Sequence, residues 1–285
     1  MGLISAVGLV QHPLRRNAAV ISGIIDWART HDAEVLGLAD EVGWLNGTVA
    51  AVDAETLARR ADIVISLGGD GTMLRAMRLT LDRQTPVLGV NLGKLGFLAE
   101  IDVPELPEAL SAIDEGRFTV EPRAGIRAIS SKCDTVVFND VVLFRTPGSR
   151  MRIQLHVDGH PFFRYAADAV VVATPTGSTA YSFSAGGPIV SPTAEGLLVT
   201  PVAPHSAFNR ALFLSSGEKL ALEVLSTSGE LAIEADGRVV CHAQPGEFID
   251  IALLPGAAQV IRLGRTTFYQ RVQRRLRLTS PIETD

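Results

Sequence analysis

At residues 66–72 the chain reads Ser-Leu-Gly-Gly-Asp-Gly-Thr, at the end of the apolar run Ile63–Leu67 and at the start of helical spacing over 72–81. Three glycines allow the backbone to turn sharply and to approach a ligand closely. The start of a helix presents free N–H groups and the positive end of its dipole, which favours phosphate. Open α/β sheets bind ligands at the carboxyl ends of their strands, so we expect a site at Asp70.

The carboxylate of Asp70 is unusual for a phosphate cradle, because it repels the anion. It is better suited to act as a general base or as the partner of a metal ion. The alternative is a glycine turn in which Asp70 only caps the following helix.

Residues 1–119 alternate short apolar runs with longer amphipathic ones, the pattern of βαβ units. We therefore predict an α/β domain with a parallel sheet. The expected strands are 4–10, 34–38, 63–67 and 87–91, and the expected helices are 17–30, 54–60, 72–81 and 104–114.

After residue 119 the apolar period changes from 3.6 to 2, and turn signals such as Asp158-Gly159 and Asp236-Gly237 separate the runs. We predict an all-β sandwich over residues 120–265. Its expected strands include 136–145, 151–157, 169–173, 220–224, 231–235 and 248–253.

Helical spacing returns near the end of the chain, at Phe268, Val272 and Leu276. We expect the segment 266–285 to complete the first domain, with its helix packed back on that domain. Its arginines are expected to form a solvated face: Arg271, Arg274, Arg275 and Arg277.

A second polar stretch covers residues 173–188 and combines small residues with many hydroxyls and Tyr181. Small residues leave space, hydroxyls supply hydrogen bonds, and an aromatic ring offers a face for a base, which together indicate a nucleotide pocket. A serine-rich turn with a helix cap would account for two or three of the hydroxyls only. They are Thr174, Thr176, Ser178, Thr179, Ser182 and Ser184.

The composition excludes several classes of protein. With 26 basic and 31 acidic side chains among 285 residues the net charge is −5, which argues against a general nucleic-acid binder. No run reaches the 18 apolar residues of a membrane helix, and the opening apolar run has no preceding basic region. We expect a soluble, cytoplasmic protein with no nucleic-acid or membrane partner, and reduced thiols at Cys133 and Cys241.

Other site patterns fail. Residues 89–95 resemble a P-loop but lack one spacer residue, and Leu95 cannot bind Mg²⁺. No G-x-G-x-x-G motif follows the first strand. His156 and His160 flank a turn and could face one another across a hairpin, but two histidines without a third ligand make a poor zinc site. We therefore interpret both as exposed hairpin residues and predict no metal-ligating residue.

Four motifs in this order make the chain similar to the NAD kinase family, including the enzymes that use ATP or inorganic polyphosphate. They are the glycine loop Gly68–Thr72, the pair Asn139-Asp140, the run Thr174–Tyr181 and the pair Asp236-Gly237. Residues 95–97, residues 204–206 and the helix that begins at Phe268-Tyr269 add to the resemblance.

The resemblance implies transfer of the γ-phosphoryl group of ATP to the 2′-hydroxyl of the adenosine ribose of NAD, which forms NADP. It also implies an N-terminal α/β domain, a C-terminal β-sandwich, a site between the two, and a homodimer or homotetramer. Mg²⁺ or another divalent cation would accompany ATP, and polyphosphate is a possible second donor.

Asp70 would be the general base, or would contact Mg²⁺ through water. Gly68, Gly69 and Asp236 would lie near the phosphates of ATP. The resemblance assigns the remaining positions to NAD: Gly71, Thr72, Phe97, Asn139, Asp140, Asp168, Thr176, Thr179, Ala180, Tyr181, Ser184 and Ala203.

Two departures from the family pattern concern affinity. Asp140 stands where the family usually has Glu, so its carboxylate would reach the ribose only through water. Ala169 stands where Gly is common, and a positive φ there would cost roughly 1 kcal/mol.

Two other functions stay open: an NAD(P)-binding regulator with weak or no catalysis, and a diacylglycerol-type lipid kinase, which shares the glycine loop.

Overall fold

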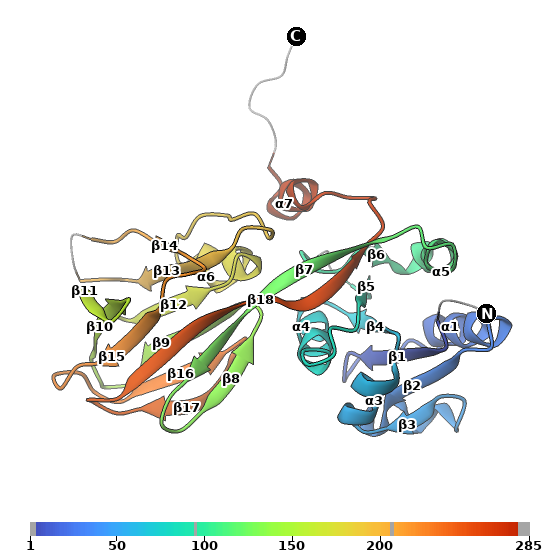
Figure 1. The fold of residues 1–285 in the computed structure, drawn as a ribbon, viewed down its shortest axis with the longest axis horizontal. Helices are drawn as coiled ribbons and strands as arrows, with labels where there is room; N and C mark the ends of the chain where they lie inside the picture. The colour runs from blue at the N-terminus through green and yellow to red at the C-terminus, as the bar shows by residue number, and fades with distance from the viewer. Residues whose placement is uncertain (1–3, 94–95, 206–207, 279–285) are drawn as a thin grey trace, which may run out of the picture. The chain divides into compact units, whose positions relative to one another are not determined.

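The computed structural model describes residues 4–93, 96–205 and 208–278. The chain divides into two compact units. Unit 1 comprises Met1–Pro122 together with Ala258–Asp285, and unit 2 comprises Arg123–Ala257. Strands β7 (Thr119–Ile129) and β18 (Phe248–Arg262) each contribute residues to both units (Figure 1).

Unit 1 contains the predicted parallel sheet, with strand order β18-β5-β4-β1-β2-β3. Every neighbouring pair along this path is parallel, and the short strand β6 (Ile101–Asp102) adds to β5. The strands are β1 (Ala6–Gln11), β2 (Glu34–Leu38), β3 (Ala50–Val52), β4 (Ile63–Gly68) and β5 (Val87–Asn91). β1, β4 and β5 are buried throughout, as expected for a sheet covered on both faces.

Helices pack on this sheet around one apolar cluster. Helix α1 (Ala18–Thr30) begins at Asn17, whose side chain accepts the N–H of Val20, and it contacts α5 (Leu106–Asp114). Trp27 of α1 donates to Asp114 of α5 at 2.8 Å. The other helices are α2 (Ala39–Val42), α3 (Ala54–Arg60) and α4 (Asp70–Leu79), with 3₁₀ turns η1 (Gly43–Leu45) and η2 (Val103–Glu105).

Helix α7 (Phe268–Leu276) belongs to unit 1, which confirms that the C-terminal helix returns to the first domain. Arg271 is only 4% exposed and pairs with buried Glu100 at 3.1 Å. Arg262 pairs with the same carboxylate at 2.9 Å. The prediction that Arg271 is solvated was therefore wrong, because Arg271 forms an ion pair with the buried carboxylate of Glu100. Arg274, Arg275 and Arg277 are exposed as predicted.

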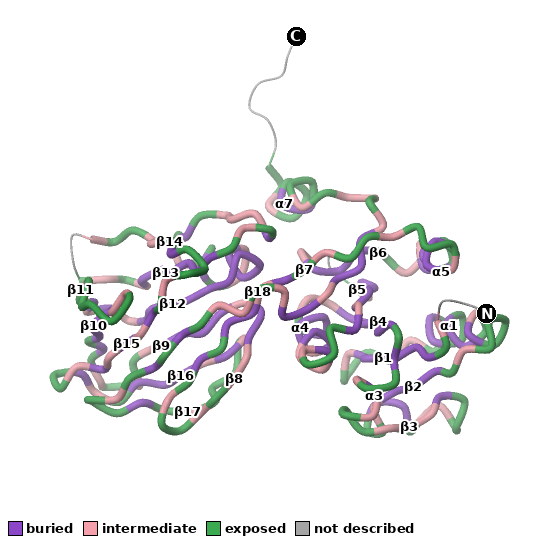
Figure 2. Tube along the Cα trace, in the orientation of Figure 1, coloured by how far each residue is buried: buried purple, intermediate pink, exposed green. Residues whose placement is uncertain are grey.

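Unit 2 is the predicted β-sandwich. One antiparallel sheet has the order β14-β13-β12-β9-β16-β17, and β11, β10, β15 and β18 are neighbours in the other, where β7 pairs with β18 and β8 pairs with β7. A single apolar cluster fills the space between the sheets. Figure 2 shows the buried residues following the strands, with exposed residues at the turns.

The strands of unit 2 have these bounds: β8 (Asp134–Val137), β9 (Asp140–Arg145), β10 (Met151–Val157), β11 (His160–Ala167), β12 (Ala169–Ala173), β13 (Gly196–Val202), β14 (Leu212–Ser215), β15 (Leu220–Val224), β16 (Leu231–Ala235) and β17 (Arg238–Ala243). The strand predicted over 136–145 is interrupted at Phe138 and Asn139, whose N–H groups donate to the Asp236 carboxylate in the turn between β16 and β17. Between β12 and β13 lie η3 (Thr176–Thr179) and α6 (Tyr181–Ser184).

Two further expectations about unit 2 were wrong. Cys133 and Cys241 form a disulfide, with their Cα atoms 6.3 Å apart, because the fold brings the turn before β8 against β17. His160 is exposed as expected, but His156 is half-buried and pairs with Glu223 at 2.8 Å, and the register places Val157 opposite His160. None of the helices in the described part of the chain has the length and apolar character needed to cross a membrane.

Candidate active site

The glycine loop of unit 1 joins β4 to α4 and holds Asp70 at the first position of the helix. The two carboxylate oxygens of Asp70 accept the backbone N–H groups of Phe97 at 2.9 Å and Leu98 at 3.0 Å. Gly96 passes so close that a Cβ atom there would lie within 3.0 Å of this carboxylate. The side chain is thus oriented by the chain after β5 and stays half-buried, with access to solvent.

The other predicted residues of unit 1 surround this carboxylate. Gly68 is buried against Thr72, whose side chain a Cβ atom at residue 68 would overlap. Gly69 and Phe97 are half-buried, and Gly71 is exposed at the start of α4. Leu95, part of the motif used for the resemblance, lies outside the described residues. Gly96 is the residue whose role sequence reasoning missed, although the motif at 95–97 contained the signal.

In unit 2 the Asp236 carboxylate organises the loop between β8 and β9. It accepts the N–H groups of Phe138 at 3.1 Å, Asn139 at 2.8 Å and Asp140 at 3.3 Å. Asp236 and Gly237 have φ values of 44° and 80°, so they form the left-handed turn between β16 and β17. These bonds make Asp236 a support for Asn139 and Asp140, while its predicted place near ATP stays a prediction.

The threonine-rich run packs on the same loop. The Thr174 hydroxyl donates to the Phe138 carbonyl at 2.6 Å and accepts the Gly177 N–H at 2.9 Å. The Thr174 N–H donates to the Asn139 carbonyl at 2.9 Å. A Cβ atom on Gly177 would lie within 3.0 Å of three backbone atoms of Asn139. Glycine is therefore required at 177 so that the two motifs can meet.

Replacing Gly177 with Ala is expected to lower the free energy of unfolding by about 1–3 kcal/mol and to weaken NAD binding, since the Asn139 backbone must move. Urea unfolding and calorimetric titration with NAD measure the two effects. Gly217→Ala is the matched control, because Gly217 is exposed in the same unit and has nothing within 4 Å of the added Cβ. Equal behaviour of the two variants would contradict this account of Gly177.

Asp140 is 4% exposed. Burial raises the pKa of its carboxyl to about 7, the nearby Asp236 carboxylate adds to the rise, and a hydrogen bond from the Tyr181 N–H opposes it. The short carboxylate thus binds the start of α6. Whether it also reaches the ribose of NAD through water stays a prediction.

The raised pKa predicts how stability depends on pH. The stability that the protonated Asp140 carboxyl provides is complete below the pKa of the unfolded chain and is lost as pH rises through about 7. The free energy of unfolding of Asp140→Asn minus that of the wild type should therefore grow between about pH 4 and 7, by up to about 1.4 kcal/mol per pH unit, and then level off. Urea unfolding over this range measures it. Exposed Asp250→Asn is the control, and a constant difference for Asp140→Asn would refute the prediction.

The hydroxyls of the run have different roles. Ser178 donates to the Val190 carbonyl and accepts its N–H, and Ser182 bonds Thr200 at 2.9 Å, so both support the fold. Thr179 donates to the Thr176 carbonyl at 3.3 Å. The buried Thr176 hydroxyl has no hydrogen-bond partner among the described residues. Ala180 is half-buried, and Tyr181 and Ser184 are exposed and can meet a ligand.

A pocket of about 560 Å³ adjoins this run within unit 2. Asp168 lines it and pairs with Arg145 at 2.6 Å, and Ala203 follows the lining residue Val202. Ala169 is in extended β12 without a positive φ, so the cost considered for alanine at that position does not arise, whereas Ala203 has φ of 47°. The lining residues are Phe144, Arg145, Pro147, Asp168, Ala169, Tyr181, Val202 and Glu234.

Within residues 4–93, 96–205 and 208–278, no group of three or more His, Cys, Asp or Glu side chains could hold a metal ion. That a divalent cation accompanies ATP stays a prediction.

Comparison with known proteins identifies the family. The model of the ATP-NAD kinase N-terminal domain matches residues 30–118, and that of the ATP-NAD kinase C-terminal domain matches residues 138–263. The chain belongs to the NAD kinase family. NAD kinase 1 of Streptomyces avermitilis is 36% identical, over 97% of this chain and 88% of that protein. The NAD kinase of Desulforamulus reducens is 34% identical, over 96% of this chain and 98% of that protein.

Solved structures show the same fold. Yeast NADH kinase, crystallised with NADH, has a TM-score of 0.86 at 24% identity and covers 99% of this chain and 90% of its own. An NAD kinase from Archaeoglobus fulgidus, in complex with ATP, has a TM-score of 0.74 at 24% identity and covers 95% of this chain and 98% of its own. The predicted α/β domain and β-sandwich of an NAD kinase are thus confirmed.

Proposed function

We propose that this member of the NAD kinase family transfers the γ-phosphoryl group of ATP to the 2′-hydroxyl of the adenosine ribose of NAD, with Asp70 as the general base. Its relatives at 34–36% identity are named NAD kinases. The observation that carries the proposal is the Asp70 carboxylate at the junction of β4 and α4, oriented by two backbone N–H groups and half-exposed.

In the proposed reaction, a carboxylate oxygen of Asp70 takes the proton of the 2′-hydroxyl as that oxygen attacks the γ-phosphorus. The bond from the γ-phosphorus to the β–γ bridging oxygen breaks, and ADP leaves. Phosphoryl transfer depends mainly on positioning and charge neutralisation, and the amide groups at the start of α4, with Gly68 and Gly69, supply positive potential. The divalent cation carried by ATP would neutralise phosphate charge.

Unit 2 is proposed to bind the dinucleotide. The loop that Asp236 supports presents Asn139, and the run locked by Thr174 and Gly177 presents Thr176 and Tyr181. Asp168 and Ala203 are proposed to contact NAD at the 560 Å³ pocket. Because the three motifs of unit 2 are held by hydrogen bonds to one another's backbone, this surface is formed before NAD arrives, which lowers the entropy cost of binding.

The test is NADP formation from NAD, ATP and Mg²⁺, detected with an NADP-specific dehydrogenase. Product that depends on both ATP and NAD is expected. NAD binding by calorimetry without product under any donor would instead indicate a regulator, and phosphorylation of diacylglycerol in liposomes would indicate a lipid kinase. Polyphosphate in place of ATP tests the second donor, and light scattering tests the proposed homodimer or homotetramer.

A further inference from the structure

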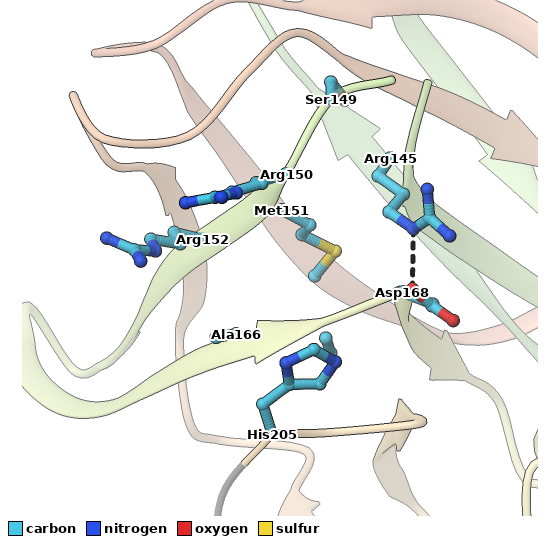
Figure 3. Close-up of a pocket in the computed structure, with 9 residues that line it drawn as sticks. Arg145, Ser149, Arg150, Met151, Arg152, Ala166, Asp168 and His205 are labelled. Atoms are coloured by element: carbon cyan, nitrogen blue, oxygen red, sulfur yellow. Dashed lines mark hydrogen bonds and ion pairs between the residues drawn. The ribbon is translucent and has the colours of Figure 1, made fainter. Parts of the chain in front are cut away.

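A second pocket of unit 2, of about 480 Å³, is rich in basic side chains. Arg145, Arg150, Arg152, Asp168 and His205 line it, as Figure 3 shows. Small or short residues complete the wall: Ser149, Ala166 and Ala167, together with Met151. Arg150 and Arg152 alternate around apolar Met151, which is the sequence signal for this basic strand face.

The charges in this pocket do not balance. Arg145 is paired with Asp168 at 2.6 Å, and Asp168 is the only carboxylate among the lining residues. The guanidinium groups of Arg150 and Arg152 have no hydrogen bond or ion pair with any described residue, and both residues are exposed. Two positive charges are therefore left for a ligand.

Strand geometry brings these two charges together. Arg150 directly precedes β10 and Arg152 is its second residue, so the two side chains share a face, roughly 7 Å apart along the strand. Figure 3 shows them extending in the same direction, away from the Arg145–Asp168 pair. Opposite Arg152 on β11 stands Ala166, which leaves the space beside the guanidinium open.

We propose that this pocket binds a phosphate or pyrophosphate anion through Arg150 and Arg152. Planar guanidinium groups match phosphate oxygens with paired hydrogen bonds. Arg145 and Asp168 line this pocket and the 560 Å³ pocket alike. The anion is therefore either the pyrophosphate of the bound dinucleotide, a source that rests on the proposed function, or a free anion that binds independently of it.

The test titrates pyrophosphate and, separately, NAD into wild-type protein and into Arg150→Gln/Arg152→Gln by calorimetry, without ATP. We expect pyrophosphate to bind the wild type and to bind the double variant about tenfold or more weakly. Arg210→Gln/Lys219→Gln is the matched control, since it removes two exposed positive charges of unit 2 outside the pocket. Arg152→Lys, which retains the charge without the planar fork, should show an intermediate loss.

If Arg150→Gln/Arg152→Gln also weakens NAD binding, and pyrophosphate competes with NAD, the anion is the pyrophosphate of the dinucleotide. Unchanged NAD affinity assigns it to a free anion. No pyrophosphate binding by the wild type, or equal weakening in both double variants, would overturn the proposal. Because the test measures binding and not turnover, pyrophosphate could bind to Arg150 and Arg152 even in a protein that makes no NADP.

Discussion

Asp70→Asn is expected to lower kcat for NADP formation by about 10²–10⁴-fold, with little change in the affinity for NAD. The amide cannot take the proton of the 2′-hydroxyl. Its NH₂ group also faces one of the N–H groups of Phe97 and Leu98, which the carboxylate accepts in the wild type. NAD affinity should persist, because the proposed dinucleotide contacts of unit 2 are unaltered. Steady-state kinetics and calorimetry measure the two quantities.

Asp62→Asn is the matched control for this variant. Asp62 is also a carboxylate of unit 1 that accepts backbone N–H groups, from Ser5 at 2.7 Å and Ala6 at 2.9 Å. The Asp62→Asn variant should lose about as much folding stability as Asp70→Asn, but its kcat should not fall. Near-normal turnover by Asp70→Asn, or equal losses in the two variants, would show that Asp70 is not the base.

Breaking the Cys133–Cys241 disulfide is expected to lower the free energy of unfolding by about 2–5 kcal/mol. The bond joins residues 108 apart in the sequence, so it restricts a large loop of the unfolded chain. Urea unfolding of the wild type with and without dithiothreitol measures the effect, with thiols counted by mass spectrometry. The Cys133→Ser/Cys241→Ser variant should have the same free energy of unfolding as the reduced wild type, and dithiothreitol should not change it. Superimposed urea unfolding curves for the oxidised and the reduced wild type would contradict the expectation.

This disulfide also bears on the dinucleotide surface. Cys133 precedes β8, which leads to Phe138, and Cys241 lies in β17, which follows the turn at Asp236. The disulfide and the bonds from Asp236 to residues 138–140 therefore join the same two segments at their opposite ends. We expect reduction to weaken NAD binding as well as stability.

Local patterns predicted much of the fold. β2, α3, β5, β10, β12, β15 and β16 have the predicted bounds, because their apolar runs end at turn or capping residues. Helix α4 begins two residues earlier than its apolar spacing indicated, at Asp70 itself. β11 and β17 lie at sheet edges and were not predicted, since they lack a strong apolar run. β7, which pairs with β18 and β8, and the buried strand β13 were not predicted either.

Partners distant in the sequence explain the remaining differences. The break at Phe138 depends on Asp236, 98 residues away, and the burial of Arg271 depends on Glu100, 171 residues away. The sequence motifs singled out the residues around Asp70 and Asn139, whose roles stay predictions. They could not show that Asp236, Thr174 and Gly177 hold the backbone of one loop, since that requires the register of β9, β12 and β16.

The most direct test of the central claim, transfer to the 2′-hydroxyl of NAD, follows the γ-phosphoryl group itself. ATP labelled at the γ-phosphorus is incubated with the protein and either NAD or NAD that lacks the 2′-hydroxyl on its adenosine ribose. We predict label on NAD as a 2′-phosphate, and no label on the deoxy analogue, which should compete with NAD for binding. Label on the analogue, or none on NAD that is bound, would contradict the account.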